Sequence, residues 1–325
     1  MLYLLVGIEV DAWNRSPAAQ QIDQRAGNLS VLTRLHALVQ RLRVRPTYLV
    51  TYSAATDERF ASMLREFRDG RDCEIGAHHL AWETPPCSDG GDRHRPYALQ
   101  LPADQFAAQV ASLTDAIATA VGERPLSYRS GRFGFSASHV FDLERAGYRI
   151  ESSVAPLLYE KRRGGPEFVG APPTPYFLAY DDPTASGASN LLEIPVSAAL
   201  NRRVPAVVGH LYGRAPFAET TKSLLERLGV ARVQWLRPFM ASLNDMCALS
   251  RRIKREGIPV LNVVLNSSEA VMGAGSSATT PEELERCYGR LENVLAYVAN
   301  DLGAIPVTFS EFRSLYCGAQ SEPFS

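Results

Sequence analysis

The chain has 325 residues, of which 46% are hydrophobic and 21% are charged, and its formal net charge is −1 at pH 7. This composition is typical of a globular protein with enough apolar mass for a substantial core. A net charge this close to zero gives no electrostatic case for binding nucleic acid or an anionic membrane surface. Length alone leaves open one large α/β barrel or two smaller domains.

The cysteines and the N-terminal residues bear on the compartment. The five cysteines are odd in number, widely spaced and free of any CxxC pair. This pattern argues against a disulfide framework and a structural zinc knuckle, and it fits a reducing compartment. The apolar start, 1–6, has no basic flank, and Glu9 and Asp11 interrupt it too early for a signal peptide or a membrane span. We therefore expect a cytoplasmic protein without a membrane span.

The first expected strand ends in two carboxylates. Residues 2–10 form a near-continuous apolar run, the pattern of a strand that is covered on both faces. Glu9 and Asp11 are two positions apart, so on an extended segment their side chains point to the same side. From these residues alone, a structural role explains them as well as a catalytic one: Asp11 would cap a turn and Glu9 would join a salt bridge.

Two adjacent histidines follow a later strand. Residues 73–75 read as a short strand, Gly76 lets the backbone turn, and His78 and His79 then stand at its carboxyl end. That end is where α/β folds carry out chemistry. Neutral imidazole is also the commonest protein ligand of divalent metals. The rival explanation is that both histidines are ordinary polar residues of a loop, and this explanation would be favoured if the stretch stood alone.

Strands and helices alternate along the rest of the chain. Apolar spacing, N-caps and terminal glycines predict helices over 28–42, 58–67, 104–121, 137–147, 220–228, 242–256, 281–302 and 310–315. Apolar runs predict further strands over 47–52, 125–128, 148–154, 191–196, 259–265 and 305–309. Residues 156–190 look like a surface insertion, and 200–240 is hard to parse. Strand followed by helix recurs about seven times, which favours a parallel sheet or barrel.

Polar side chains gather at the ends of four of these strands. They are Glu9 and Asp11; His78 and His79; Arg129 and Arg132; and Asn266, Ser267, Ser268 and Glu269. In a barrel, all these ends meet at one rim. One carboxylate with imidazoles can hold a zinc-like ion, a second carboxylate can take the proton of a bound water, and a guanidinium keeps that base ionised. These groups predict metal-assisted hydrolysis of an amide or ester.

Five stretches resemble the polysaccharide deacetylases of carbohydrate esterase family 4, in particular the bacterial branch found with exopolysaccharide genes. They are 8–13, 74–78, Trp82 with 84–86, 128–134, and 267–269 with the glycines that follow. The resemblance implies an α/β fold, a distorted (β/α)7-type barrel that forms one domain over 1–325 with an insertion-rich segment at about 156–240. It also implies hydrolysis of acetyl groups on N-acetylated sugars with a divalent metal, zinc or else cobalt, nickel or manganese.

The resemblance further implies a role for each residue of the site. The catalytic residues would be Glu9 as the base, Arg129 as the group that steadies it, and Asn266 at the position of the general acid. The metal ligands would be Asp11, His78 and, less directly, His79. The residues in contact with substrate would be Trp13, Trp82, Arg132, Phe133, Ser267, Ser268 and Glu269.

Two positions depart from the family pattern. Relatives usually carry the second loop histidine two or four residues after the first, where this chain has Leu80 and Trp82, so His79 is the substitute. Adjacent side chains tend to diverge, and joint coordination by His78 and His79 therefore requires a kinked loop. The late strand usually ends in a histidine that acts as general acid. This chain has Asn266, which can donate a hydrogen bond but no proton.

These departures leave two further functions open beside the metal-dependent deacetylase. Leu80 and Asn266 favour a catalytically impaired relative that binds glycans or regulates another protein. The other possibility is a metal-free amidase that uses Glu9 and Arg129.

Overall fold

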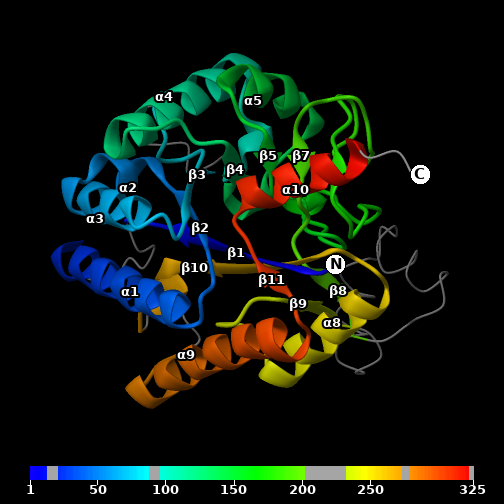
Figure 1. Ribbon diagram of the computed structural model, residues 1–325. Helices are drawn as coiled ribbons and strands as arrows, with labels where there is room; N and C mark the ends of the chain where they lie inside the picture. The colour runs from blue at the N-terminus through cyan, green and yellow to red at the C-terminus, as the bar shows by residue number, and fades with distance from the viewer. Residues whose placement is uncertain (13–20, 88–95, 202–231, 273–277, 322–325) are drawn as a thin grey trace.

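The structure, a computed structural model, describes residues 1–12, 21–87, 96–201, 232–272 and 278–321. Within these residues, seven parallel strands form a curled sheet in the order β10-β1-β2-β3-β4-β5-β7 (Figure 1). A short antiparallel strand, β6, lies beside β7, and β11 pairs with the start of β1. The strands are β1 (Tyr3–Val10), β2 (Thr47–Val50), β3 (Glu74–His79), β4 (Ser127–Ser130), β5 (Ile150–Glu151), β6 (Tyr176–Phe177), β7 (Leu192–Glu193), β10 (Val260–Asn266) and β11 (Ile305–Pro306).

Helices cover the outside of this sheet, as the alternation of strand and helix predicts. In Figure 1, α4 and α5 lie above the sheet, α1 to α3 lie to its left, and α8 and α9 lie below it. The helices are α1 (Gln21–Arg41), α2 (Tyr52–Thr56), α3 (Glu58–Asp69), α4 (Ala103–Val121), α5 (Val140–Ala146), α8 (Leu243–Arg255), α9 (Pro281–Ala296) and α10 (Phe309–Ser321). The predicted (β/α)7-type barrel is therefore confirmed.

Strand β1 shows why a near-continuous apolar run forms the centre of the barrel. Its side chains alternate between two covered faces, so both faces need apolar residues. Leu4, Val6 and Ile8 belong to the large core cluster that includes the helices, whereas Leu5 belongs to a smaller cluster inside the barrel. Glu9 has the same parity as Leu5. Its carboxylate is therefore placed inside the barrel, at the carboxyl end of the strand.

The barrel is distorted because irregular chain closes the gap between β7 and β10. The backbone N–H of Asn262 donates to Ser197 Oγ at 2.9 Å, and the N–H of Val264 donates to the carbonyl oxygen of Leu236 at 3.0 Å. These contacts satisfy an edge of β10 that would otherwise stay open. Both partners lie in the segment 156–240, which was predicted to be an insertion. That segment therefore also completes the barrel.

The same segment carries little regular structure in its described part. β8 (Ala198–Leu200) and β9 (Val233–Trp235) pair antiparallel in a small second sheet. This pairing was not predicted, because the stretch 200–240 has no clear periodicity. The helix predicted over 220–228 lies outside the described residues.

Gly7 lies where the Arg129 side chain passes β1 inside the barrel. A Cβ atom here would stand 2.9 Å from Arg129 Nη1 and 3.2 Å from Cζ of Phe309. We therefore expect Gly7→Ala to lower the free energy of unfolding by about 1–3 kcal/mol, because the buried guanidinium has no room to move aside. Denaturant unfolding measures the change. Gly289→Ala, at a position with no neighbour within 4 Å, is the control, and equal effects of the two would contradict the close approach.

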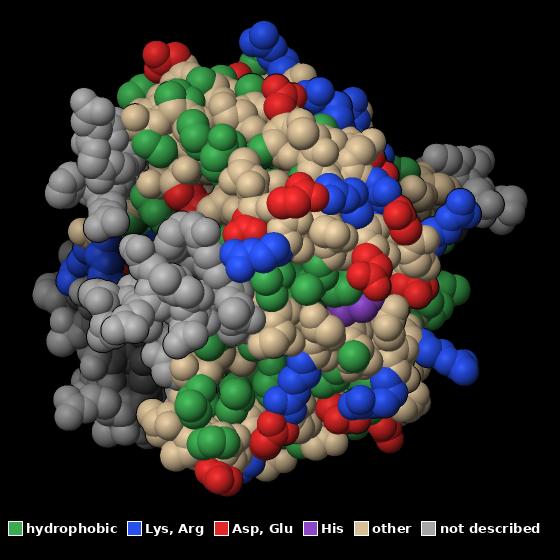
Figure 2. All heavy atoms as spheres, turned by 90° about the vertical axis from the view of Figure 1, so that its left-hand side faces the viewer, with side chains coloured by type: hydrophobic (Ala, Val, Ile, Leu, Met, Phe, Trp, Pro, Cys, Tyr) green, Lys and Arg blue, Asp and Glu red, His purple; other side chains and the backbone are tan. Residues whose placement is uncertain are grey.

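Basic and acidic side chains are interspersed on the face that Figure 2 shows, which is the left-hand side of Figure 1. Ion pairs join α1 to α9: Arg34 to Glu285 at 2.6 Å and Arg41 to Glu292 at 2.9 Å. Exposed pairs of this kind contribute no more than about 1 kcal/mol each.

Over the described part of the chain, every helix is too short or too polar to cross a bilayer.

Candidate active site

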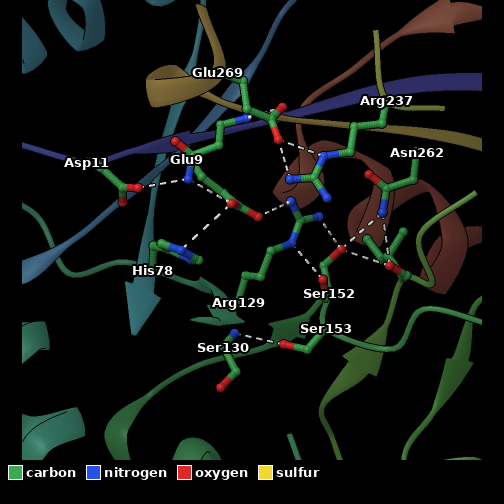
Figure 3. A network of polar contacts seen from close by, with 12 residues as sticks. Glu9, Asp11, His78, Arg129, Ser130, Ser152, Ser153, Arg237, Asn262 and Glu269 are labelled. Carbon is green, nitrogen blue, oxygen red and sulfur yellow. Dashed lines mark hydrogen bonds and ion pairs between the residues drawn. The ribbon is translucent and has the colours of Figure 1, made fainter. Parts of the chain in front are cut away.

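The carboxyl ends of four strands bring predicted polar residues together inside one end of the barrel (Figure 3). β1 and β10 set Glu9 opposite Asn266, and β3 and β4 set His78 opposite Arg129. Glu9 Oε2 is 3.8 Å from His78 Nε2, and Glu9 Oε1 accepts a hydrogen bond from Arg129 Nη1 at 3.5 Å. With Asp11 just beyond the end of β1, these residues form the rim cluster: Glu9, Asp11, His78, Arg129 and Asn266.

The Glu9 carboxylate is held as an anion although only 8% of the residue is exposed. Burial raises the pKa of Glu9, but His78, Arg129 and Arg237 and a hydrogen bond from Asn266 together outweigh burial and leave this pKa below its ordinary value. Glu9 is therefore ionised near neutral pH, and this is the form that a general base needs.

Arg129 is fully buried, and its guanidinium is fixed from several sides. Nε donates to the carbonyl oxygen of Ser152 at 2.7 Å, and Nη2 donates to Ser152 Oγ at 2.8 Å. Asn262 Nδ2 donates to the same hydroxyl oxygen at 3.0 Å, which fixes it from β10. Burial lowers the pKa of Arg129, and the charge of Glu9 opposes that shift. The cation beside Glu9 is thus in place before any substrate binds.

The amide of Asn266 lies between the two carboxylates of the rim cluster. Its Nδ2 donates to Glu9 Oε2 at 3.2 Å and to Asp11 Oδ2 at 2.8 Å. Ser268 donates to Asn266 Oδ1 from its N–H at 2.8 Å and from its hydroxyl at 2.6 Å, so the amide nitrogen must face the carboxylates. Both amide hydrogens are therefore engaged. Asn266, which we predicted at the position of the general acid, aligns Glu9 with Asp11.

The three residues after Asn266 hold the rim cluster in place. Ser267 Oγ accepts a hydrogen bond from the N–H of Asp11 at 3.2 Å, and Ser268 orients the Asn266 amide. Glu269 Oε1 accepts a hydrogen bond from Arg237 Nε at 2.8 Å. Ser267, Ser268 and Glu269 thus bond to protein groups, and direct contact between them and a substrate stays a prediction.

His79 points away from the rim cluster, so the prediction that it is a metal ligand is wrong. Its Nδ1 bonds to the hydroxyl of Tyr128 at 2.8 Å and its Nε2 bonds to Gln109 Oε1 at 2.7 Å, while its ring packs edge-on against Phe106. Burial lowers the pKa of His79 to about 4, so the ring is neutral. The physical reason is the alternation of side chains along β3: His78 faces the barrel interior and His79 faces the helices.

Two buried ligand atoms of the rim cluster have no hydrogen-bond partner: Asp11 Oδ1 and His78 Nδ1. Zinc accepts both types of ligand atom, and burial raises the pKa of Asp11 to about 6, a shift that a nearby cation would oppose. A catalytic zinc ion needs three protein ligands, however. Among the described residues, no group of three His, Cys, Asp or Glu is placed to hold an ion. His79 faces the helices and Leu80 is apolar, so Asp11 and His78 are left without the third ligand that the predicted metal site needs.

The predicted apolar walls lie close to the strand ends. The Arg132 guanidinium stands 5.5 Å above the Trp82 ring, and the Phe133 ring packs against Trp235 with centroids 5.6 Å apart. Arg132 and Phe133 both have a left-handed backbone, with φ of 53° and 58°. Two such residues in a row are strained, and strain of this kind clusters at ligand sites. Contact of Trp82, Arg132 and Phe133 with substrate stays a prediction. Trp13, the remaining predicted wall residue, lies outside the described residues.

Three residues of the site are missing from the sequence prediction: Arg237, Ser152 and Asn262. Arg237 lies in the stretch 200–240, where no periodicity could reveal it. Asn262 could have been found, because it is the one polar residue in the apolar run 259–265. Nothing in the sequence distinguishes Ser152 from its serine neighbour.

No family model and no curated protein matches the sequence. Solved structures do match it. A Mycobacterium smegmatis protein provisionally named a polysaccharide deacetylase has a TM-score of 0.58 at 14% identity, over 100% of this chain and 93% of that chain. A Parabacteroides distasonis protein provisionally named a glycoside hydrolase or deacetylase has a TM-score of 0.61 at 13% identity, over 97% of this chain and 70% of that chain. A GH57 branching enzyme from Thermococcus kodakaraensis has a TM-score of 0.53 at 12% identity, over 97% of this chain and 71% of that chain. The chain therefore has the fold of the polysaccharide deacetylases.

Proposed function

We propose that this chain is a hydrolase that removes acetyl groups from N-acetylated sugars, with Glu9 as its base. The observation that carries the proposal is the buried, ionised Glu9 carboxylate between His78 and Arg129. It stands at the carboxyl end of the strands, where barrel enzymes hold their active sites. The fold shared with proteins named as deacetylases supports an acetylated sugar as the substrate.

Glu9 accounts for the proton transfers that amide hydrolysis needs. It accepts a proton from a water molecule while the water oxygen forms a bond with the carbonyl carbon of the acetyl group. The bond between that carbon and the sugar nitrogen then breaks, and the Glu9 carboxyl returns the proton to the nitrogen. Arg129 keeps Glu9 ionised between turnovers. Because one carboxylate serves as base and then as acid, we expect a rate about 10²–10⁴-fold below that of a site with a dedicated proton donor.

A divalent metal ion stays a prediction. Asp11 and His78 would supply two ligands, one fewer than zinc takes from the protein in a catalytic site. No step of the proposed reaction therefore depends on an ion.

We expect Leu80→His to bind zinc more tightly than the natural chain does. Residue 80 follows His78 by two positions, so on extended backbone its side chain points to the same side. Zinc should raise the melting temperature of the variant and bind at about one equivalent, because a ligand of the folded state stabilises it. Thermal melting and elemental analysis measure both effects. In Leu80→His/Asp11→Asn the rise should disappear, and a rise that persists would locate the zinc elsewhere.

Acetate release from N-acetylglucosamine oligosaccharides tests the proposed function. We expect release by protein purified without chelator, and equal release after treatment with chelator. Release that stops with chelator and returns with zinc would support the metal-dependent form of the same hydrolase. No release from any of these sugars would contradict a hydrolase.

A catalytically impaired glycan-binding or regulatory protein is the second candidate, and Asn266 favours it. Its amide occupies the space between Glu9 and Asp11 and has no proton to deliver. Oligosaccharide binding without acetate release would support this candidate over the hydrolase.

A further inference from the structure

Two buried glutamates outside the rim cluster have no part in the proposed proton transfers. Glu151 on β5 and Glu193 on β7 lie opposite each other in the register of the sheet, and both are fully buried. Ile150 and Leu192, the residues before them, belong to the cluster inside the barrel, so the two carboxyl groups lie on the other face of the sheet. The groups are close enough for a hydrogen bond between them, which requires a proton on one of the two.

The donors around this pair reach all but one of its oxygen atoms. The N–H of Ser153 donates to Glu151 Oε2 at 2.9 Å, and the Ser153 hydroxyl donates to Glu151 Oε1. The N–H of Val154 donates to Glu193 Oε1 at 3.1 Å. Glu193 Oε2 is buried and has no hydrogen-bond partner among the described residues. A proton on this oxygen would turn it into a donor toward Glu151 and would satisfy both groups.

The other ionisable side chains that face the pair in the described chain are engaged elsewhere. They are Arg129 and Tyr128 from β4 and Tyr176 from β6. The Tyr176 hydroxyl donates to a backbone carbonyl oxygen at 2.6 Å, and the Tyr128 hydroxyl bonds to an imidazole nitrogen at 2.8 Å. Burial raises the pKa of both tyrosines, so both stay neutral near neutral pH. Arg129 is therefore the cation that faces the pair.

Burial and charge favour a proton on Glu193. Burial and the charge of Glu151 raise the pKa of Glu193 well above its ordinary value, and the charge of Arg129 opposes this rise only in part. Burial also raises the pKa of Glu151, but its hydrogen bonds and the charge of Arg129 oppose that rise. Two carboxyl groups this close titrate as a pair, so the first proton relieves the repulsion for both.

The pair is attached to the segment that holds Arg129. Ser152 accepts two hydrogen bonds from Arg129 inside the barrel, and Ser153, the next residue, donates both of its hydrogens to Glu151. The Ser153 hydroxyl oxygen also accepts a hydrogen bond from the N–H of Ser130 at 2.7 Å, which joins the segment to β4 (Figure 3). The Glu151 carboxylate therefore fixes, from the other face of the sheet, the backbone to which the guanidinium is bonded.

We propose that Glu151 and Glu193 share one proton at neutral pH and position Arg129 through the segment 152–154. Glu193 is the carboxylic acid, and it donates to the Glu151 carboxylate, which accepts both donors of Ser153. The two glutamates are positioning residues, because they act on the site only through Arg129. The inference rests on the proposed function only in that Arg129 steadies the base there, and its tests need no turnover.

Denaturant unfolding of the natural chain and of Glu193→Gln, between about pH 5 and about pH 9, tests the shared proton. A carboxyl group whose pKa is raised in the folded state stabilises that state below its unfolded pKa, and this stability is lost as the pH rises to the folded pKa. Glutamine keeps a donor toward Glu151 but has no proton to lose. The folding equilibrium constant of the natural chain should therefore fall relative to that of the variant, by up to about tenfold per pH unit. Equal pH dependence of the two chains would overturn the shared proton.

Glu285→Gln is the matched control for this comparison. Its hydrogen bond with Arg34 lowers the pKa of Glu285 below the ordinary value of 4.5. Glu285 thus titrates below about pH 5 in both the folded and the unfolded state. The ratio of the folding equilibrium constants of the natural chain and this variant should stay constant over the same pH range. A slope as large as that of Glu193→Gln would contradict the assignment of the proton to the pair.

Hydrogen exchange of the Arg129 Nε–H, followed by NMR, tests the positioning. The signal is assigned by its loss in Arg129→Lys. Glu151→Gln removes one of the two oxygens that accept from Ser153, so exchange should become at least about tenfold faster. Glu193→Gln, which preserves the hydrogen bonds of the pair, should keep the exchange rate within about twofold. If Glu151→Gln does not fold, Ser153→Ala breaks the same link and should give the same increase.

Each result separates the pair from the proposed function. An unchanged exchange rate in the folded variant, or an equal increase in Glu193→Gln, would overturn the positioning role. Failure to release acetate would contradict the hydrolase and would leave the unfolding and exchange results as they stand. Acetate release together with equal pH dependence of the natural chain and Glu193→Gln would keep the hydrolase and refute the shared proton.

Discussion

Glu9→Gln should reduce the rate of acetate release by about 10²–10⁴-fold and leave the affinity for oligosaccharides within about twofold. Glutamine has the shape of glutamate and keeps an oxygen that can accept the hydrogen bond from Arg129. Its amide takes no proton near neutral pH, however, so the attacking water stays neutral. The loss should therefore fall on kcat and not on KM. Steady-state measurement of released acetate, with calorimetry for binding, separates the two quantities.

A matched variant and a folding measurement make this result specific. Glu285→Gln makes the same chemical change at a side chain that is 62% exposed on α9, and it should keep the natural rate. Thermal melting of both variants shows whether a lost rate reflects unfolding. If folded Glu9→Gln keeps most of the natural rate, Glu9 is not the base. Asp11, the other carboxylate of the rim cluster, would then be substituted in the same way.

The barrel and its polar rim could be predicted because both depend on short-range pattern. The run 2–10 needs two covered faces, and the polar residues that end such runs must meet wherever parallel strands end together. Glu9, His78 and Arg129 were found in this way, from three strands. The alternation of side chains along a strand also indicated that His79 would not bind a metal together with His78, because adjacent residues of β3 face opposite sides.

The rest of the site depends on register and on irregular chain, which pattern does not reveal. Asn266 bridges the two carboxylates only because β10 pairs with β1 in one register, although Asn266 is 257 residues from Glu9 and 255 residues from Asp11 in the sequence. Arg237 reaches Glu269 from a stretch without periodicity. The loss of the third metal ligand is likewise a matter of geometry, since a histidine is present beside His78 but points into the core.

Arg129→Met should lower the free energy of unfolding by about 3–5 kcal/mol, the largest stability change that we expect from one substitution in this protein. The guanidinium is fully buried, and its removal leaves the buried Glu9 carboxylate without its cation and Ser152 without two donors. Denaturant unfolding at neutral pH measures the loss. Arg41→Met removes an arginine that also pairs with a glutamate, but at the surface, where the side chains are 59% and 42% exposed. That control should change stability by less than about 1 kcal/mol.

The double variant Glu9→Gln/Arg129→Met tests whether the two charges depend on each other. Most of the cost of Arg129→Met should come from the anion left behind, so neutralising that anion should recover part of the lost stability. We expect the double variant to be more stable than the sum of the two single effects predicts, by about 0.5–3 kcal/mol. Additive effects would mean that Arg129 stabilises the barrel through Ser152 and the buried Glu151 and Glu193 carboxyl groups, and not through Glu9. Glu9 would then owe its ionised state to His78, Arg237 and Asn266, and the role of Arg129 as the group that steadies the base would be refuted.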